Sequence, residues 1–230
     1  MRSSMRGSGR KLVVVLAIMV AAMSVATASA SATTPEFSFE LPESVTYSGG
    51  QITFEGAKNI SVKCETIVGT TSVTGFKQFS SALTLKGCNA SLFGIPAKCS
   101  SAGAAEGEVV ANTVNARLEY ISKAAHEVAL ILNSGGKNST IATFKCGSET
   151  EVIRGEVIAR ITPVKTLTTK FPLAFSGAKG VQELTQYENE KGEKIAVSPL
   201  ELGTNGVFEK SSLNSTGLAL LFSKSAEILG

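Results

Sequence analysis

The sequence HEVALILN, residues 126–133, carries the pattern that decides the fold class. Val128, Leu130 and Leu132 fall on one side of an extended chain, and the intervening residues fall on the other side. This period of two is that of a β-strand with one buried face, because successive side chains of a strand point in opposite directions. The sequence therefore predicts a half-buried strand at this position.

The same kind of signal continues on both sides, over residues 107–175. The further runs are EVVANTVNARLEYI, STIATFKC, TEVIRGEVIARITP and TTKFPLAF, separated by a few turn-forming residues. Short strands joined by Gly-containing and polar turns are typical of antiparallel sandwiches and barrels. We therefore expect an all-β chain, an antiparallel sandwich or open barrel, with little helix after the signal peptide.

Two segments are less regular. Residues 89–106 are rich in Ser, Ala and Gly, and they are either a connector between two β-subdomains or a loop pinned at Cys88 and Cys99. Residues 177–194 contain many Glu and Lys residues without an apolar face, which predicts a charged surface excursion.

The first 32 residues have the organisation of an export signal. Four basic residues precede an apolar run at 12–26, and small residues at 28–32 form possible cleavage sites. A membrane anchor is the alternative, but a run of about 15 residues is shorter than the roughly 20 that cross a bilayer. We expect cleavage, no membrane span afterwards, and a single exported domain over residues 33–230, with a possible subdivision near 89–106.

Removal of this segment changes the charge of the chain. The full sequence has 22 Lys+Arg against 19 acidic residues, and loss of the four basic residues of the leader leaves 18 against 19, a formal charge of −1. A nucleic-acid partner is not expected, because affinity for a phosphate backbone depends mainly on cationic side chains.

The chain has four cysteines, an even number that favours two disulfides in an exported protein. Three connectivities are possible. We expect Cys64–Cys88 and Cys99–Cys146, because the runs that end at Cys64 and Cys88 are plausible strand partners. Closing these loops contributes about 3 to 4 kcal/mol each in the chain-entropy model.

The residues for catalysis or metal binding are sparse. The sequence contains no Asp, which excludes an Asp-centred triad, an aspartic dyad and Asp-rich calcium loops. His126 is the sole histidine, and it accompanies neither a nucleophile motif nor a Cys-x-x-Cys pair. We expect no catalytic residue, no metal site and no cofactor.

Glutamate pairs are the basis of one alternative function, because glycosidases place two carboxyl groups on either side of the scissile bond. The candidate groups are Glu106/Glu108, Glu149/Glu151 and Glu188/Glu190/Glu193. We expect these glutamates to be solvated charges. We also expect Arg154 and Arg160 to pair with Glu across the sheet.

Sugar binding without catalysis usually uses aromatic side chains as flat platforms. The chain has no Trp and three tyrosines. Tyr187 lies in the polar excursion and is the candidate ligand-binding residue.

Five runs of the sequence belong together in a further comparison: AAEGEVVANTVNARLEYI, HEVALIL, ATFKCG, VIRGEVIARITPV and TTKFPLAFSGAKGVQ. In this order they resemble a group of uncharacterised, secreted β-rich proteins found in multiple copies in soil actinobacteria. The resemblance covers residues 37–186 and is most specific over 107–182. It implies bacterial export and a β-fold held by disulfides, without any known activity.

The leader, the cysteines and the lack of a catalytic constellation indicate a non-enzymatic envelope or extracellular protein with a binding or structural role. Its expected partner is a surface glycan or another protein. A Glu-based polysaccharide hydrolase and a barrel that holds a small apolar ligand are the two alternatives.

Overall fold

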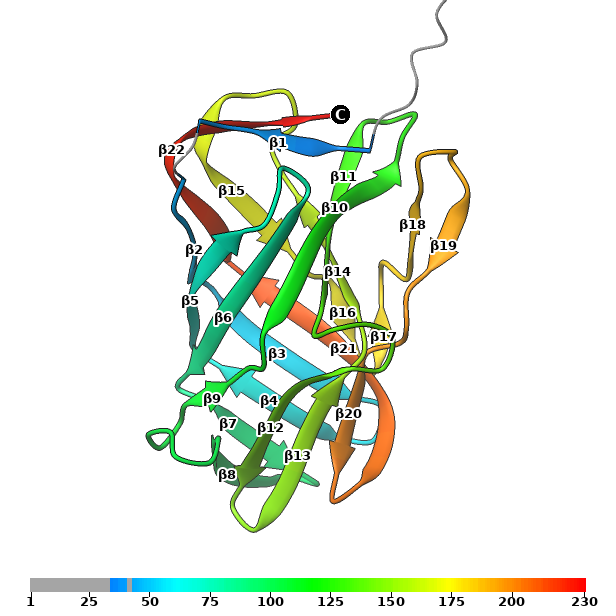
Figure 1. Ribbon diagram of the computed structural model, residues 1–230. Helices are drawn as coiled ribbons and strands as arrows, with labels where there is room; N and C mark the ends of the chain where they lie inside the picture. The colour runs from blue at the N-terminus through cyan, green and yellow to red at the C-terminus, as the bar shows by residue number, and fades with distance from the viewer. Residues whose placement is uncertain (1–33, 41–42) are drawn as a thin grey trace, which may run out of the picture. The chain divides into compact units, whose positions relative to one another are not determined.

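The computed structural model describes residues 34–40 and 43–230, and the expected export signal, residues 1–32, lies outside the described residues (Figure 1). The described residues form β-strands and connecting turns. The first eleven strands are β1 (Glu36–Ser38), β2 (Val45–Gly49), β3 (Gln51–Gly56), β4 (Ile60–Cys64), β5 (Thr66–Val73), β6 (Gln78–Lys86), β7 (Asn89–Leu92), β8 (Ile95–Ser100), β9 (Val109–Val110), β10 (Val114–Ser122) and β11 (Glu127–Asn133). The others are β12 (Thr140–Cys146), β13 (Glu149–Arg154), β14 (Val157–Ile161), β15 (Thr168–Ala174), β16 (Gly177–Ala178), β17 (Val181–Gln182), β18 (Gln186–Glu188), β19 (Lys194–Ala196), β20 (Glu201–Thr204), β21 (Val207–Thr216) and β22 (Ala219–Leu229).

The strands close into two barrels. Barrel I follows the order β10-β11-β14-β15-β22-β2-β5-β6, and pairing of β6 with β10 completes the ring. Barrel II follows the order β12-β13-β20-β21-β3-β4-β7-β8 and is also closed. Every pairing of the described strands in the two barrels is antiparallel. The all-β antiparallel prediction is confirmed, and closure removes the exposed strand edges that an open sheet would present.

The chain builds both barrels at once by passing between them. Each hairpin of barrel II, namely β3–β4, β7–β8, β12–β13 and β20–β21, is inserted between strands of barrel I (Figure 1). Residues 89–106, which we expected to be a connector or a pinned loop, begin with the hairpin β7–β8, which completes barrel II. The composition of this segment, rich in Ser, Ala and Gly, did not predict the two short strands β7 and β8.

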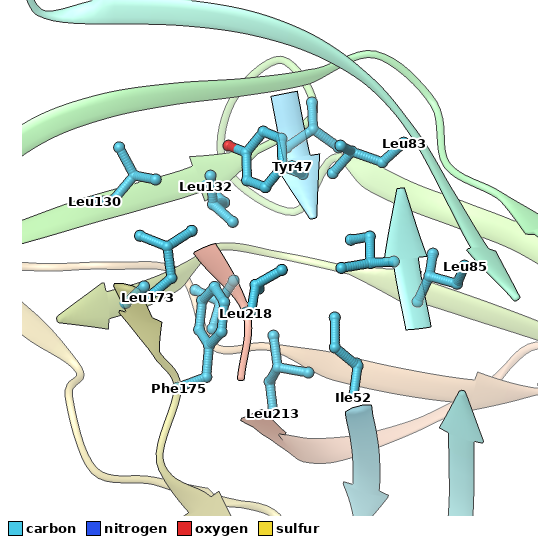
Figure 2. Packing of buried hydrophobic residues seen from close by; sticks show 14 of the residues in the cluster. Tyr47, Ile52, Leu83, Leu85, Leu130, Leu132, Leu173, Phe175, Leu213 and Leu218 are labelled. Carbon is cyan, nitrogen blue, oxygen red and sulfur yellow. The ribbon is translucent and has the colours of Figure 1, made fainter. Parts of the chain in front are cut away.

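One hydrophobic core runs through both barrels. Figure 2 shows the cluster where the barrels meet, with Tyr47, Leu83 and Leu132 from barrel I close to Ile52 and Leu213 from barrel II. The cavity at this junction has an entirely apolar lining and a volume of about 50 Å³. Side chains therefore fill the interior, as they do in other small barrels.

The two disulfides are Cys64–Cys88 and Cys99–Cys146, as predicted, with Cα–Cα distances of 4.0 and 4.1 Å. The predicted reason for the first pairing was wrong. The strand that ends at Cys64 pairs with β3 and β7, whereas β6 pairs with β5, β9 and β10. The two cysteines come together because Lys63 lies opposite Asn89, which places their neighbours across the same ladder.

Strand β11 is buried on both faces, so the expectation of a half-buried strand was wrong. Its outward residues Ala129 and Ile131 form a second buried cluster with Ile158 of β14. Ile121 of β10 packs against this cluster, and so do Leu184, Tyr187 and Val197 from the chain after β15. The predicted charged excursion therefore does have an apolar face, and that face covers the outside of barrel I.

Candidate functional site

The candidate site is a polar shelf on the outer face of barrel I. It lies beside residues 177–200, the covering segment, which packs on that face through Leu184, Tyr187 and Val197. On β10, Val114, Ala116 and Leu118 are buried, so alternation turns Asn115 and Arg117 outward. Register places Asn115 opposite Asn133 of β11, and Arg117 opposite Gln78 of β6. A pocket of about 260 Å³ lies over this part of the sheet, lined by Thr74, Gln78, Phe79, Asn115, Ala116, Arg117 and Asn133. We call these residues the Arg117 shelf.

Arg117 links the shelf to the covering segment. Its guanidinium lies 5.3 Å from the ring centroid of Tyr187, and its Nη2 donates a 3.4 Å hydrogen bond to the tyrosine hydroxyl. Two carboxyl groups flank the same guanidinium, with Glu119 Oε1 at 3.6 Å and Glu156 Oε1 at 3.7 Å. These contacts hold the long arginine side chain in one place, so the shelf presents an oriented donor.

Glu156 is buried and held by two further donors. Asn133 Nδ2 lies 3.2 Å from Oε1, and the backbone N–H of Ser198 donates to Oε2 at 2.9 Å. The preceding residue explains this second contact. Gly155 has φ of 108°, and a Cβ at this position would lie 2.1 Å from the carbonyl oxygen of Pro199. Only glycine permits this approach of residues 198–200 to Glu156.

Glu119 has a different environment. Its Oε2 is buried without a hydrogen-bond partner. Burial raises the pKa of Glu119, an effect that Arg117 opposes and that the nearby carboxylate of Glu190 reinforces. Glu119 and Glu156 are therefore two carboxyl groups beside one cation, and only Glu156 receives neutral hydrogen-bond donors.

A second pocket, of about 200 Å³, lies on the other side of Glu156. The covering segment supplies most of its lining, including Leu184 and Val197, while β21 supplies Ser211. A smaller hollow of about 140 Å³ lies at Tyr187 and Lys194. The covering segment therefore forms one wall of a polar region whose floor is the rigid sheet of barrel I.

The structure brings the sequence-predicted Tyr187 to this region. It is half-buried, and its ring packs against Arg117 and the second cluster instead of standing as an open platform. The four cysteines lie in or beside barrel II, and His126 lies at the β10–β11 turn, with Nδ1 3.3 Å from Nζ of Lys165.

The glutamate pairs singled out in the sequence lie apart from the shelf or at its margin. Glu108 forms an ion pair with Lys86 at 3.0 Å, and Glu188 accepts a hydrogen bond from the backbone of Lys123 at 2.9 Å. The expectation of solvated charge was wrong for Glu151, whose side chain is 0% exposed inside barrel II. The alternation of β13 turns this residue toward the core together with Ile153.

The two expected cross-sheet ion pairs are confirmed, Arg154 with Glu201 at 2.6 Å and Arg160 with Glu127 at 2.8 Å. Sequence reasoning missed Arg117, Asn133 and Glu156, which form the centre of the shelf. Arg117 and Asn133 occupy outward positions of predicted strands, but the pairing order that makes them neighbours is not encoded in any local pattern.

Among residues 34–40 and 43–230, no group of three or more His, Cys or Glu side chains is placed to hold a metal ion. The same residues include no helix long and apolar enough to cross a membrane. Comparisons with protein-family models, with curated proteins and with solved structures find no match. The resemblance to secreted actinobacterial proteins therefore stays a prediction.

Proposed function

We propose that this chain is an exported, non-enzymatic binding protein of the envelope or the extracellular space, and that its ligand is a neutral surface glycan bound on the Arg117 shelf. The observation that carries the proposal is the pocket of about 260 Å³, in which all lining residues except Thr74 come from three adjacent strands of one closed barrel. Groups on paired strands are pre-organised, so ligand binding does not have to order them.

The chemistry of the shelf favours hydroxyl groups. The amides of Gln78, Asn115 and Asn133 each offer both donors and an acceptor, as a sugar hydroxyl does. The charge of Arg117 is opposed by two nearby carboxyl groups, those of Glu119 and Glu156. An anionic ligand would be repelled by those carboxyl groups, and a neutral, polyhydroxylated ligand would not.

The two disulfides support the exported location. They indicate an oxidising compartment, where such bonds persist. Export through cleavage after the leader and release to the cell surface are part of the proposal.

The small apolar ligand has less support than the glycan. A barrel that carries such a ligand needs an interior cavity of about 300 Å³ or more. The apolar cavity at the barrel junction has about 50 Å³, close to the space of one or two water molecules.

The test is a thermal-shift panel of neutral and acidic oligosaccharides on the purified, oxidised protein, followed by calorimetric titration of the best ligand. A ligand at about 100 times its Kd stabilises the protein by about 2.7 kcal/mol. Asn115→Ala and Gln78→Ala remove exposed amides from the shelf and should weaken binding about tenfold or more. Thr70→Ala, at an exposed position of β5, is the matched control and should bind like the unmodified protein.

The proposal fails if no oligosaccharide shifts the melting temperature, or if the shelf variants and the control bind equally well. A preference for acidic over neutral oligosaccharides would also contradict it.

A polysaccharide hydrolase is the second candidate, favoured by the two carboxyl groups beside Arg117. Glu119, whose pKa is raised, has the property of a general acid, and Glu156 would act as its partner. Release of reducing ends from a polysaccharide, abolished by both Glu119→Gln and Glu156→Gln, would establish this function. Binding without such release supports the non-enzymatic proposal.

A further inference from the structure

The tip of hairpin β7–β8 has an unusual residue in its turn. Leu92 lies opposite Ile95, so Phe93 and Gly94 form a two-residue turn, with φ of 51° and 87°. Two positive φ values are those of a type I′ turn, which favours Asn, Asp or Gly in its first position. A phenylalanine there is strained, because its Cβ crowds the backbone in the left-handed region.

The strain is not offset by burial. Phe93 is 70% exposed and Ile95 is 69% exposed, so the hairpin projects two large apolar side chains into solvent. Single exposed apolar residues are common on protein surfaces. Phe93 differs because its backbone conformation is one that a phenylalanine disfavours, and such outliers occur mainly at functional sites.

The tip belongs to the end of barrel II that carries its hairpin turns, called the mouth of barrel II. The turns of its four hairpins gather at the end away from barrel I, at the lower end of the molecule in Figure 1. Val207, 73% exposed, follows the Asn205–Gly206 turn of hairpin β20–β21, which lies across the barrel order from β7–β8. The mouth therefore carries apolar side chains on opposite sides of its rim.

Cationic side chains accompany this rim. Lys98 and Lys145 line one hollow of about 450 Å³ together with Ser100 and Thr143, and the N–H of Gly147 beside Lys145 bonds to the carbonyl of Lys98 at 3.1 Å. Lys58, in the turn after β3, is also exposed.

Four acidic groups accompany the three lysines at this end, and two of them are turned into the barrel. Glu106 lines the same hollow as the two lysines. Glu149 accepts hydrogen bonds from Ser148 and Asn205, and Glu151 and Glu209 have buried carboxylate oxygens that face the barrel interior. Outside the barrel interior, the three lysines therefore outnumber the two glutamates, Glu106 and Glu149.

We propose that the mouth of barrel II docks on a lipid bilayer that carries anionic headgroups, with Phe93 and Ile95 inserted at the headgroup boundary and Lys58, Lys98 and Lys145 facing the anionic lipids. Separate projecting tips suit a bilayer, which deforms around them, better than a protein partner, which requires a continuous complementary patch. The shelf on the outside of barrel I lies on a different face, so docking goes beyond the proposed function and does not depend on it.

The test is co-sedimentation of the purified protein with vesicles of phosphatidylcholine alone or mixed with phosphatidylglycerol. The unmodified protein should bind the mixed vesicles at least about tenfold more tightly than the neutral ones. Phe93→Asn should weaken binding to the mixed vesicles about tenfold, because it removes the inserted ring and suits the turn. Lys98→Gln/Lys145→Gln should remove most of the preference for the anionic vesicles.

Leu167→Asn is the matched control, since Leu167 is 69% exposed in the β14–β15 connection of barrel I. It should bind the vesicles like the unmodified protein, and all variants should keep the far-ultraviolet circular dichroism spectrum of a β-protein. Failure of the unmodified protein to sediment with either vesicle would overturn the proposal, as would equal loss in Phe93→Asn and Leu167→Asn. Binding to cell envelopes that disappears after protease treatment of those envelopes would assign the rim to a protein partner instead.

Discussion

Thr204 Oγ1 donates a hydrogen bond of 2.8 Å to Oε2 of Glu151 inside barrel II. The other carboxylate oxygen of Glu151 is buried without a partner, and so are both oxygens of Glu209 on β21. Burial raises the pKa of Glu151; the hydrogen bond from Thr204 lowers it, and the carboxylates of Glu149 and Glu209 raise it further. The surroundings of Glu151 therefore favour its protonated form.

The first prediction follows for stability against pH. The folded-state pKa of Glu151 lies above its unfolded value of about 4.3. Below that value Glu151 is protonated in both states, so the free energy of unfolding carries no penalty for ionising it. As pH rises through the folded pKa, this residue makes the folded state progressively less stable. Glu151→Gln removes the group that ionises. The free energy of unfolding of this variant, measured by urea denaturation, should therefore fall less between pH 5 and pH 8 than that of the unmodified protein.

The control for this experiment is Glu183→Gln, at an exposed position. Its pH dependence should match that of the unmodified protein. Parallel curves for Glu151→Gln and the unmodified protein would show that the buried carboxyl group does not titrate as described.

The second prediction concerns the disulfides. Cys64–Cys88 and Cys99–Cys146 join residues separated by 24 and 47 positions. In the chain-entropy model these loops contribute about 3.5 and about 4 kcal/mol. Replacing either pair by alanines should lower the free energy of unfolding by amounts of this order, and intact mass after alkylation should reveal no free thiol in the unmodified protein. Two or more alkylated cysteines would contradict the framework.

The third prediction concerns Gly155, which combines a positive φ with a close approach to Pro199. Gly155→Ala should lower the free energy of unfolding by more than about 2 kcal/mol, because a side chain there must displace backbone. Gly192 has a φ of 77° and open space around it. Gly192→Ala should cost only about 1 kcal/mol. Equal losses in thermal or urea denaturation would mean that the contact with Pro199 is unimportant.

The fourth prediction concerns the rim of barrel II. Phe93→Asn relieves a left-handed phenylalanine, so it should raise the free energy of unfolding by about 1 kcal/mol while removing an exposed ring. A gain in stability together with a loss of vesicle binding would show that Phe93 strains the turn and that its ring is needed for docking on the bilayer. A loss of stability measured by urea denaturation would mean that the ring packs favourably where it lies.

Much of the fold was predictable because its signals are local. The alternation in HEVALILN and the Gly-containing turns between the strands each depend on residues close in sequence. The partner strands were less predictable. Cys64 and Cys88 were paired correctly for the wrong reason, because β4 lies beside β7 and not beside β6. Strand order depends on closing two rings, which is a property of the whole chain.

The candidate site was even less predictable. Tyr187 was predicted as a ligand-binding residue because it is an aromatic residue in a polar segment. Its partner Arg117 lies 70 positions earlier, so no local pattern indicates their contact. Glu156 carries no local sequence signal, and only the approach of residues 198–200 shows why it is buried.

The sequence by itself determined the strand content and the antiparallel class, because side-chain alternation and turn chemistry act over a few residues. Only the tertiary structure decided that the chain passes back and forth between two barrels, and that a segment rich in charge covers the outside of one of them. It also decided which polar residues share a face. Those outcomes depend on which distant strands meet, and the free energy that selects them comes from burying one shared core.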